Sequence, residues 1–512
     1  MPQDLPGFYY DKEKNRYFPI KGPIPGSSRS SSSTSASAQE PTPKSTTAMN
    51  LCRRTGIRAS KLLQVRELYG NVIPFRKGKC NIKEEIQKMQ VSQPVVWGYS
   101  GTDKIVDAAL EQIHIDVQTP EGQTEKDLLL AGGVNGSLSL VEVGKVRQRF
   151  DYGVKCLPDR VWPSKEDPIE CNRNPGNIWT PRGSVLQMPS NISCIKLFGK
   201  HSPSMDDGSN VQDAIISTLG SETSGGSLYI VKLSELLDLN SSISTIRQRI
   251  HEVTTFNCTI WTADYNFNGN RAVVGTNLGA ALVDLETGRK SWVCHSKSDV
   301  FAEQFIHSGN AILCGFRNGA IVTVDIRDKR ASSLSRLTTH RITCSPLDKT
   351  LGNSSRQWFK LSGNIYPSYT VKMPSSISCL TSLRFDDHYF LASSMDGSVK
   401  LYDHRLIQRG AVQSYEGHVN SHTRIQLGVD PSEKFVMSGG EDCNLRIWSI
   451  KSGELLFEDK FSKSVPSTVC WRRAERLTGL WDERKSYKEY QQSCSMEAWL
   501  GTHEGLFYMH WS

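Results

Sequence analysis

One phrase recurs through most of the sequence: a strand of small or apolar residues, a tight turn bearing Gly, Asn or Asp, and a second strand with alternating apolar residues. Asn-Gly and Asp-Gly accept the positive φ that a two-residue hairpin needs, and the alternation buries one face of each strand. The phrase occurs seven times, at 130–141, 225–231, 274–284, 314–325, 392–403, 438–448 and 501–511. The sequence therefore predicts seven hairpin-based units of antiparallel sheet.

The sixth unit carries a recognisable signature. Gly417-His418 precedes it, Ser438 lies on its first central strand, and Trp448 closes the second. Gly-His and Trp-Asp are typical of WD repeats, which form propeller blades of four strands and ~40–45 residues. We predict an all-β fold, a seven-bladed WD-repeat β-propeller with a partly disordered N-terminal arm that contains a short helix.

The spacing of the turns indicates how the ring closes and where it is interrupted. The chain stops at Ser512, after the third strand of the seventh unit, so we expect 93–99 to supply the missing outer strand and leave no open edge. Sequence beyond the length of a blade is assigned to insertions, placed in the polar, Pro-rich stretches 144–190, 201–224, 331–371 and 472–493.

The N-terminal residues differ from the rest in charge and composition. Residues 1–90 hold 16 Lys+Arg and 7 Asp+Glu, which gives them a net charge of +9. The whole chain has a net charge of +8, so the remaining 422 residues have a net charge of −1. We predict a docking segment at 1–21, a disordered Ser/Thr/Pro-rich linker at 22–50, a basic helical arm at 51–90 and the propeller at 91–512. The docking segment is defined by its aromatic residues Phe8, Tyr9, Tyr10, Tyr17 and Phe18.

Within the arm, 57–69 has good helix formers, with Leu62, Val65 and Tyr69 at helical spacing among basic residues. On periodicity alone this pattern favours a helix that caps the edge of the propeller over a helix that inserts into a partner, and both readings stay open.

Several classes of protein are disfavoured. No run of about 18 apolar residues or secretory leader is present, so we expect an intracellular protein of the nucleus and/or cytoplasm with no membrane partner. The 13 cysteines form no CxxC pair, and no phosphate loop, nucleophile elbow or His-Glu-x-x-His occurs. We expect no metal, no cofactor and no enzymatic activity. Direct nucleic-acid binding is disfavoured because the propeller itself is neutral.

The most informative motif lies where two consecutive units end. One finishes Val324-Asp325-Ile326-Arg327 and the next Tyr402-Asp403-His404-Arg405. Asp can accept backbone N–H groups in the following turn, and Arg presents a planar fork of donors. A single copy is explained by a local salt bridge; paired copies at one position of adjacent blades favour an interface.

These motifs resemble the signature of WD-repeat substrate receptors of the cullin-4 RING ubiquitin ligases, the cullin-four-associated factors. The resemblance extends to 6–18, 299–305, 415–420 and 440–449, so it spans the start, middle and end of the chain. It implies that Arg327 and Arg405, supported by Asp325 and Asp403, contact the damaged-DNA-binding-protein adaptor. In related receptors a helix before the propeller enters the adaptor, a role that the resemblance gives to Leu62, Leu63 and Leu68.

The resemblance implies a non-catalytic substrate receptor that holds an unknown protein substrate near the cullin-4 ligase and so promotes protein ubiquitination. The alternative is a WD-repeat scaffold in an RNA-processing or ribosome-assembly complex, which would tolerate replacement of Arg327 and Arg405. The substrate cannot be read from the sequence.

Overall fold

A computed structural model shows two units, 1–56 and 57–512. The residues that it describes are 8–11, 16–19, 67, 72–75, 78–103, 105–119, 122–144, 153–163, 175–181, 184–199, 212–221, 224–233, 245–306, 309–327, 338–341, 358–363, 365, 369–471 and 496–511. In the first unit, β1 (Phe8–Asp11) and β2 (Arg16–Pro19) form an antiparallel hairpin in the predicted docking segment, which was not expected to contain strands.

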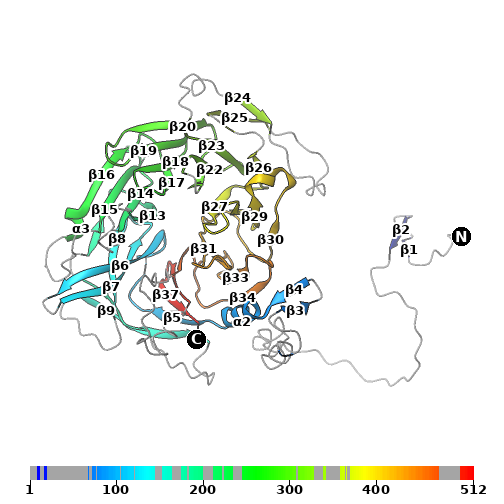
Figure 1. The fold of residues 1–512 in the computed structure, drawn as a ribbon, viewed down its shortest axis with the longest axis horizontal. Helices are drawn as coiled ribbons and strands as arrows, with labels where there is room; N and C mark the ends of the chain where they lie inside the picture. Colours follow the sequence, from blue (N-terminus) through cyan, green and yellow to red (C-terminus); the bar gives the residue numbers. More distant parts are fainter. Residues whose placement is uncertain are drawn as a thin grey trace. The chain divides into compact units, whose positions relative to one another are not determined.

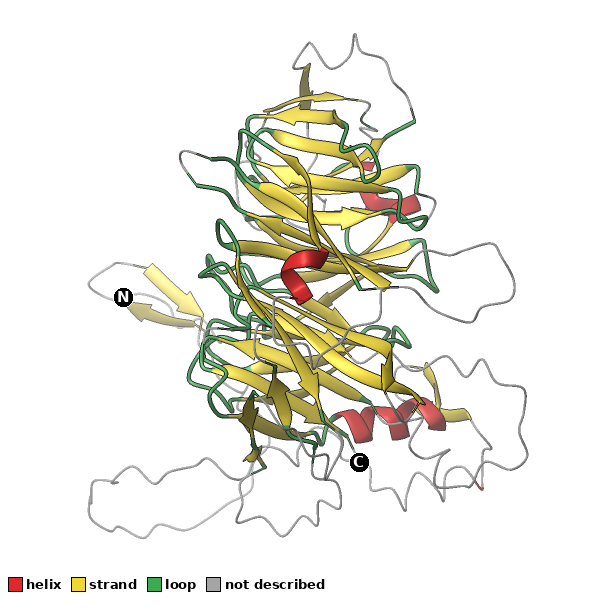
Figure 2. Ribbon diagram, turned by 90° about the vertical axis from the view of Figure 1, so that its left-hand side faces the viewer, coloured by secondary structure: helices red, strands yellow, loops and turns green. Residues whose placement is uncertain are grey.

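The larger unit is a ring of seven antiparallel sheets, which confirms the predicted seven-bladed propeller (Figure 1). Strands make up most of the described residues (Figure 2). Blade 1 is built from β6 (Ala109–Thr119), β7 (Gly122–Gly132), β8 (Ser137–Val143) and β11 (Ile178–Thr180). Blade 2 is built from β13 (Ile192–Gly199), β14 (Gln212–Thr218), β15 (Ser227–Lys232) and β16 (Ile250–Thr255). Blade 3 is built from β17 (Ile260–Tyr265), β18 (Arg271–Thr276), β19 (Gly279–Asp284) and β20 (Lys290–Ser296).

Blades 4 to 6 follow the same order. Blade 4 comprises β21 (Val300–Phe305), β22 (Ala311–Phe316), β23 (Ala320–Asp325) and β26 (Val371–Lys372). Blade 5 comprises β27 (Ile377–Ser382), β28 (Tyr389–Ser394), β29 (Val399–Asp403) and β30 (Gln413–Tyr415). Blade 6 comprises β31 (Leu427–Val429), β32 (Phe435–Gly439), β33 (Leu445–Ser449) and β34 (Leu455–Asp459).

Blade 7 closes the ring as predicted. Its first three strands are β35 (Thr468–Trp471), β36 (Glu497–Thr502) and β37 (Gly505–His510), and its outer strand is β5 (Val95–Tyr99). The register places Tyr508 opposite Trp97 and His510 opposite Val95. The two ends of the propeller sequence are therefore joined by one ladder of backbone hydrogen bonds.

The hairpin turns follow the chemistry expected from their sequence. Gly136 and Gly397 both have φ of 82°, in the left-handed region that glycine adopts without strain. The side chain before each glycine accepts a backbone N–H two residues on: Asn135 from Ser137 at 2.9 Å, and Asp396 from Ser398 at 3.1 Å. These local contacts fix the register of each central hairpin.

The core is divided into seven apolar clusters, each filling the space between two neighbouring blades. Between blades 1 and 2, for example, Leu128 and Leu140 meet Ile195 and Ile216, all at 2% exposure or less. Burying one such side chain contributes roughly 1.5–3 kcal/mol. Because each cluster needs both of its blades, the ring is stabilised as a whole.

Two of the stretches assigned to insertions contain propeller strands, so that part of the prediction is wrong. The stretch 201–224 includes β14, the second strand of blade 2, and 144–190 includes β11, the outer strand of blade 1. The stretch 144–190 also holds β9 (Val154–Cys156), β10 (Pro158–Trp162) and β12 (Val185–Gln187), of which β10 joins blade 7 beside β5. Strands this short among polar residues carry little periodicity.

The stretch 331–371 is an insertion, but it is not only loop. Its strands β24 (Thr338–Arg341) and β25 (Trp358–Gly363) form a hairpin, and β25 pairs with β20 at the outer edge of blade 3. The insertion therefore leaves blade 4 after β23 and extends the sheet of the preceding blade. The stretch 472–493 lies outside the described residues.

Helices are few in the part of the chain that the structure describes. They are α2 (Ile82–Val91), α3 (Thr245–Arg249) and the 3-10 helix η3 (His404–Arg409), while a short hairpin of β3 (Val72–Phe75) and β4 (Gly78–Asn81) precedes α2. Asn81 caps α2 by accepting the Lys83 N–H at 3.0 Å, with Glu84 and Glu85 in the first turn. No helix among the described residues is long and apolar enough to cross a membrane.

Candidate functional site

The two Asp-x-Arg motifs occupy equivalent positions in neighbouring blades. Asp325 is the last residue of β23, the third strand of blade 4, and Asp403 is the last residue of β29, the third strand of blade 5. In an antiparallel blade the first and third strands end at the same side. Both motifs therefore lie on the ring face where these strands end, which we call the motif face.

Each aspartate holds its own arginine in a fork. The Arg327 Nη2 donates to Asp325 Oδ2 at 2.7 Å and its Nε to Oδ1 at 3.1 Å, while the backbone N–H of Arg327 also donates to Oδ1 at 2.9 Å. Arg405 repeats this with Asp403, at 2.9 Å for Nη2, 3.1 Å for Nε and 2.8 Å for the backbone N–H. The local salt bridge considered from the sequence is present in both copies.

Burial separates the two members of each pair. The side chains of Asp325 and Asp403 are 6% and 4% exposed, whereas those of Arg327 and Arg405 are 66% and 55% exposed. The hydrogen bond from Arg405 lowers the pKa of the Asp403 carboxyl, and the same contact raises the pKa of Arg405. A buried anion thus fixes the orientation of an exposed cation, in each of two adjacent blades.

The residues before the aspartates belong to the core. Val324 and Tyr402 occupy the place of the Trp in the WD signature and are 0% and 2% exposed. Tyr402 stacks on Phe390 with ring centroids 5.4 Å apart, and His404 lies on Phe390 at 4.6 Å. Val324 and Tyr402 therefore pack behind the two motifs, and the Asp–Arg contacts are alike in the two blades.

Of the predicted arm helix only Glu67, which is helical, is described; Leu62, Leu63 and Leu68 lie outside the described residues, so their role stays a prediction. The helix that the structure describes in this region is α2, which sequence reasoning missed. Its Lys88 contacts Glu454 at 3.3 Å and its Glu84 contacts Lys451 at 3.2 Å, both on the turn that follows β33. The helix α2 is therefore anchored at the motif face of blade 6, next to the blade that carries Arg405.

A further arginine on the motif face was also missed. Asp284, the last residue of β19, is the counterpart of Asp325 and Asp403 in blade 3, but Leu285 and Glu286 follow it. The register places Arg271, the first residue of β18, directly opposite Asp284. Blade 3 therefore also carries an arginine beside this aspartate position, supplied by the neighbouring strand.

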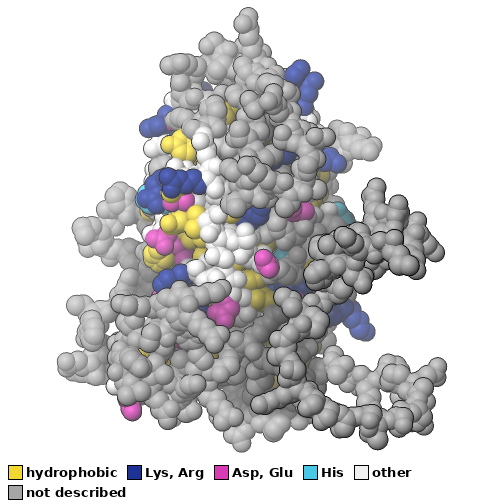
Figure 3. All heavy atoms as spheres, turned by 90° about the vertical axis from the view of Figure 1, so that its right-hand side faces the viewer, with side chains coloured by type: hydrophobic (Ala, Val, Ile, Leu, Met, Phe, Trp, Pro, Cys, Tyr) yellow, Lys and Arg dark blue, Asp and Glu magenta, His cyan; other side chains and the backbone are white. Residues whose placement is uncertain are grey.

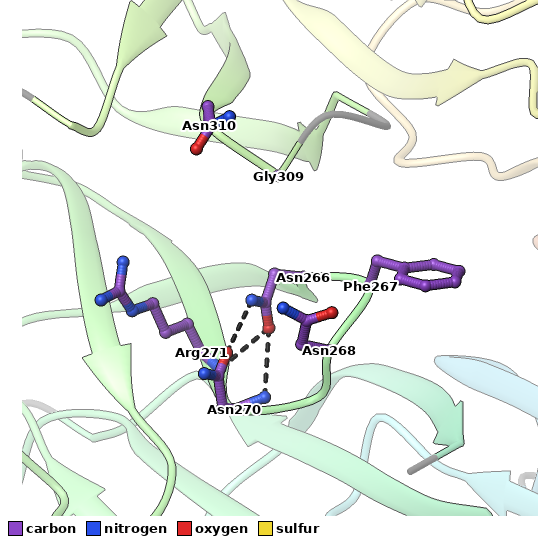
Figure 4. A pocket seen from close by; sticks show the side chains of 7 residues that line it. All are labelled: Asn266, Phe267, Asn268, Asn270, Arg271, Gly309 and Asn310. Carbon is purple, nitrogen blue, oxygen red and sulfur yellow. Dashed lines mark hydrogen bonds between the residues drawn. The ribbon is translucent and has the colours of Figure 1, made fainter. Parts of the chain in front are cut away.

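A hollow of about 320 Å³ lies beside Arg271 on the motif face (Figure 4). The turns between the first and second strands of blades 3 and 4 supply its lining, which is Asn266, Phe267, Asn268, Asn270, Arg271, Gly309 and Asn310. The Asn310 carbonyl accepts the Ile326 N–H at 3.0 Å, so the hollow adjoins the Asp325–Arg327 motif. Sequence reading gave no signal for it, because the two turns are brought together only by the ring.

Side chains of both signs are interspersed on the side of the molecule shown in Figure 3. No group of three or more His, Cys, Asp or Glu with the geometry of a metal site occurs among the residues that the structure describes. Within the described part of the chain, the arginines of the motif face are therefore the candidates for a binding site.

Fold and site together define a WD-repeat β-propeller with paired Asp-x-Arg motifs on one face. Residues 362–470 match the family model described as the DDB1- and CUL4-associated factor 4 beta-propeller domain. This match covers the part of the propeller from β25 to β35.

Three relatives document the resemblance. DDB1- and CUL4-associated factor 4 of Bos taurus is 23% identical over 485 residues, covering 92% of this chain and 81% of that protein. Its Homo sapiens counterpart is 27% identical over 220 residues, 42% of this chain and 36% of that protein. DDB1- and CUL4-associated factor 4-like protein 2 of Homo sapiens is 29% identical over 182 residues, 36% of this chain and 37% of that protein. In the two human matches, the aligned part thus spans just over a third of the relative.

The comparisons confirm the family resemblance drawn from the sequence. They do not favour the alternative of a scaffold in an RNA-processing or ribosome-assembly complex.

Proposed function

We propose that the protein is a non-catalytic substrate receptor of a cullin-4 RING ubiquitin ligase, and that it docks on the DDB1-type adaptor through Arg327 and Arg405. The observation that carries the proposal is the pair of equivalent forks, in which buried Asp325 and Asp403 hold two exposed guanidiniums on neighbouring blades of one face. The names of the relatives, which refer to DDB1 and CUL4, support the identity of the partner.

The proposed mechanism is proximity. The propeller holds a protein substrate near a charged ubiquitin-conjugating enzyme, which raises the effective concentration of the substrate lysine without any catalytic side chain of its own. A preorganised guanidinium suits this role, because Arg recognises carboxylates through two parallel hydrogen bonds and loses little side-chain entropy when it is already oriented. The contacts of α2 with the motif face of blade 6 support a role for this part of the chain at the same surface.

The test is capture of the purified adaptor by the full chain and by its Arg327→Ala, Arg405→Ala double variant, with a melting curve on each. Losing a fork from a desolvated interface costs ~2–5 kcal/mol of binding, while the backbone N–H groups of the two turns still hydrogen-bond the buried carboxylates in the variant. We therefore expect the double variant to lose the adaptor and to stay folded, with a lower melting temperature because two buried carboxylates lose their guanidinium donors.

Arg317 offers a matched control. It lies in the same blade as Arg327, its side chain is equally exposed at 66%, and its ion pair with Asp299 is 3.4 Å long, but it sits at the turn before β23, on the opposite face. Arg317→Ala should bind the adaptor like the wild type. If the wild-type chain does not bind the adaptor, the proposed function is wrong; if the double variant binds as tightly as Arg317→Ala, the assignment of the two arginines is wrong.

A further inference from the structure

The hollow between the blade 3 and blade 4 turns has the lining of a site for an anionic group. Asparagine side chains dominate it, one arginine joins them, and none of its lining residues is acidic. Figure 4 shows Asn266, Asn268 and Asn270 on one side and Asn310 across from them, while the ring of Phe267 extends away from the hydrogen-bonded asparagines.

The turn that forms the floor of the hollow is fixed by its own hydrogen bonds. Asn266 Oδ1 accepts the backbone N–H groups of Asn270 and Arg271 at 3.2 and 2.9 Å, and its amide nitrogen donates to Asn270 Oδ1 at 2.7 Å. Arg271, the first residue of β18, therefore follows a turn whose conformation is fixed by hydrogen bonds, and its backbone position is well defined. A site needs such support for its contacts to be specific.

Arg271 differs from the two motif arginines in how its charge is used. Its side chain is exposed, and within the described part of the chain its guanidinium makes no hydrogen bond or ion pair. The nearby carboxylate of Asp284 accepts the backbone N–H groups of Glu286 and Thr287 and the Thr287 hydroxyl at its Oδ1, and these hydrogen bonds, with a smaller effect from the charge of Arg271, lower the pKa of Asp284. The donors of Arg271 are available to another molecule.

We infer that Arg271 and the asparagine-lined hollow form a third contact for the adaptor, receiving a carboxylate side chain of its surface beside the two motif arginines. This inference rests on the proposed function. Arg271, Arg327 and Arg405 lie on the motif face of three consecutive blades, so one acidic surface can face all of them. The hollow adds amide donors around the guanidinium, and Phe267, 59% exposed, supplies an apolar contact at its margin.

The experiment compares binding of the purified adaptor to the full chain and to Arg271→Ala, by calorimetry or interferometry, at two salt concentrations. Removing one charge-assisted hydrogen-bonded contact should weaken binding about tenfold, and the loss should shrink at high salt if it is electrostatic. Arg271→Lys keeps the charge but not the planar fork, so it should lie between Arg271→Ala and the wild type.

Arg289 provides the control, since it is an exposed arginine of blade 3 in the turn after β19, and it does not line the hollow. Arg289→Ala should leave the affinity within about twofold of the wild type. Equal losses in Arg271→Ala and Arg289→Ala would overturn the inference in favour of a general effect of net charge. Unchanged binding by Arg271→Ala, alongside loss in the Arg327, Arg405 double variant, would overturn the third contact and leave the proposed function standing. A wild type that does not bind the adaptor would overturn both.

Discussion

Arg424 of blade 6 reaches across the ring to Ser193 of blade 2, where its Nη1 donates to the backbone carbonyl at 2.9 Å. The same nitrogen donates to the carbonyl of Trp261 in blade 3. Blades 2 and 3 lie opposite blade 6 in a seven-membered ring, so one side chain links residues 231 positions apart in the sequence. Both carbonyls lie near the start of first strands, on the face opposite the motifs.

We expect Arg424→Met, which keeps the length and loses the donors, to destabilise the fold by about 1–3 kcal/mol, because hydrogen bonds from a charged group to carbonyls are lost. Chemical denaturation at neutral pH measures this. Exposed Arg409→Met is the control and should change stability by less than ~0.5 kcal/mol. Equal stability of the two variants would show that the link across the ring contributes nothing.

Asp403 should influence adaptor binding although it is too buried to touch a partner. Asp403→Ala removes the carboxylate that receives the Arg405 fork and its backbone N–H, so the guanidinium would lose its fixed orientation. We expect adaptor affinity to fall about 3- to 10-fold, less than on removal of Arg405 itself, because the charge remains but must be ordered on binding.

The measurement is a titration of the adaptor with Asp403→Ala and with Asp284→Ala, the equivalent change in blade 3, whose carboxylate holds no arginine fork. Stability should fall in both variants, since both aspartates accept backbone N–H groups of the following turn. Only Asp403→Ala should lose affinity through Arg405. Equal affinity losses would mean that the effect comes from the turn and not from the fork.

The propeller could be predicted because each of its hairpins is specified by residues that are neighbours in the sequence. Asn135-Gly136 and Asp396-Gly397 specify hairpins whatever surrounds them, and the same alternation repeated seven times leaves few other folds. The strand β14 was assigned to an insertion because its seven residues follow a long polar stretch. The helix α2 did carry a readable signal, Asn81 followed three residues later by Glu84, a capping pattern.

In the candidate site, the Asp–Arg contacts could be predicted because each motif is contiguous in the sequence. In each motif a single residue separates the Asp from the Arg, so the spacing alone brings the two side chains together. Arg271 and Asp284 are 13 residues apart and meet only through the register of β18 and β19, and Gly309–Asn310 joins them through the packing of two blades. Contacts of this kind depend on the pairing of strands, which a linear motif does not record.

His404, between Asp403 and Arg405, should make stability depend on pH. Its ring lies on Phe390 and its Nε2 is buried without a hydrogen-bond partner among the described residues. Burial lowers the pKa of His404 to about 4, against the opposing effect of Asp403 and with a smaller lowering from His388. Because the folded state favours the neutral ring, the unfolded chain binds more protons between pH 4 and 6.5. Stability therefore rises with pH through this window and is lost as the pH falls from 6.5 towards 4.

We expect His404→Phe, which keeps the contact with Phe390 and cannot titrate, to flatten this dependence. The wild type should lose roughly 2–3 kcal/mol more than the variant between pH 6.5 and 4, since one pKa unit corresponds to about 1.4 kcal/mol. Buried His418, whose pKa is also lowered by burial, leaves a residual slope of the same sign in both proteins. Melting temperatures across the window measure the difference, with exposed His503→Gln as the control. Parallel profiles for His404→Phe and the wild type would show that His404 titrates alike in the folded and unfolded chain, and that its burial beside the motif does not hold it neutral.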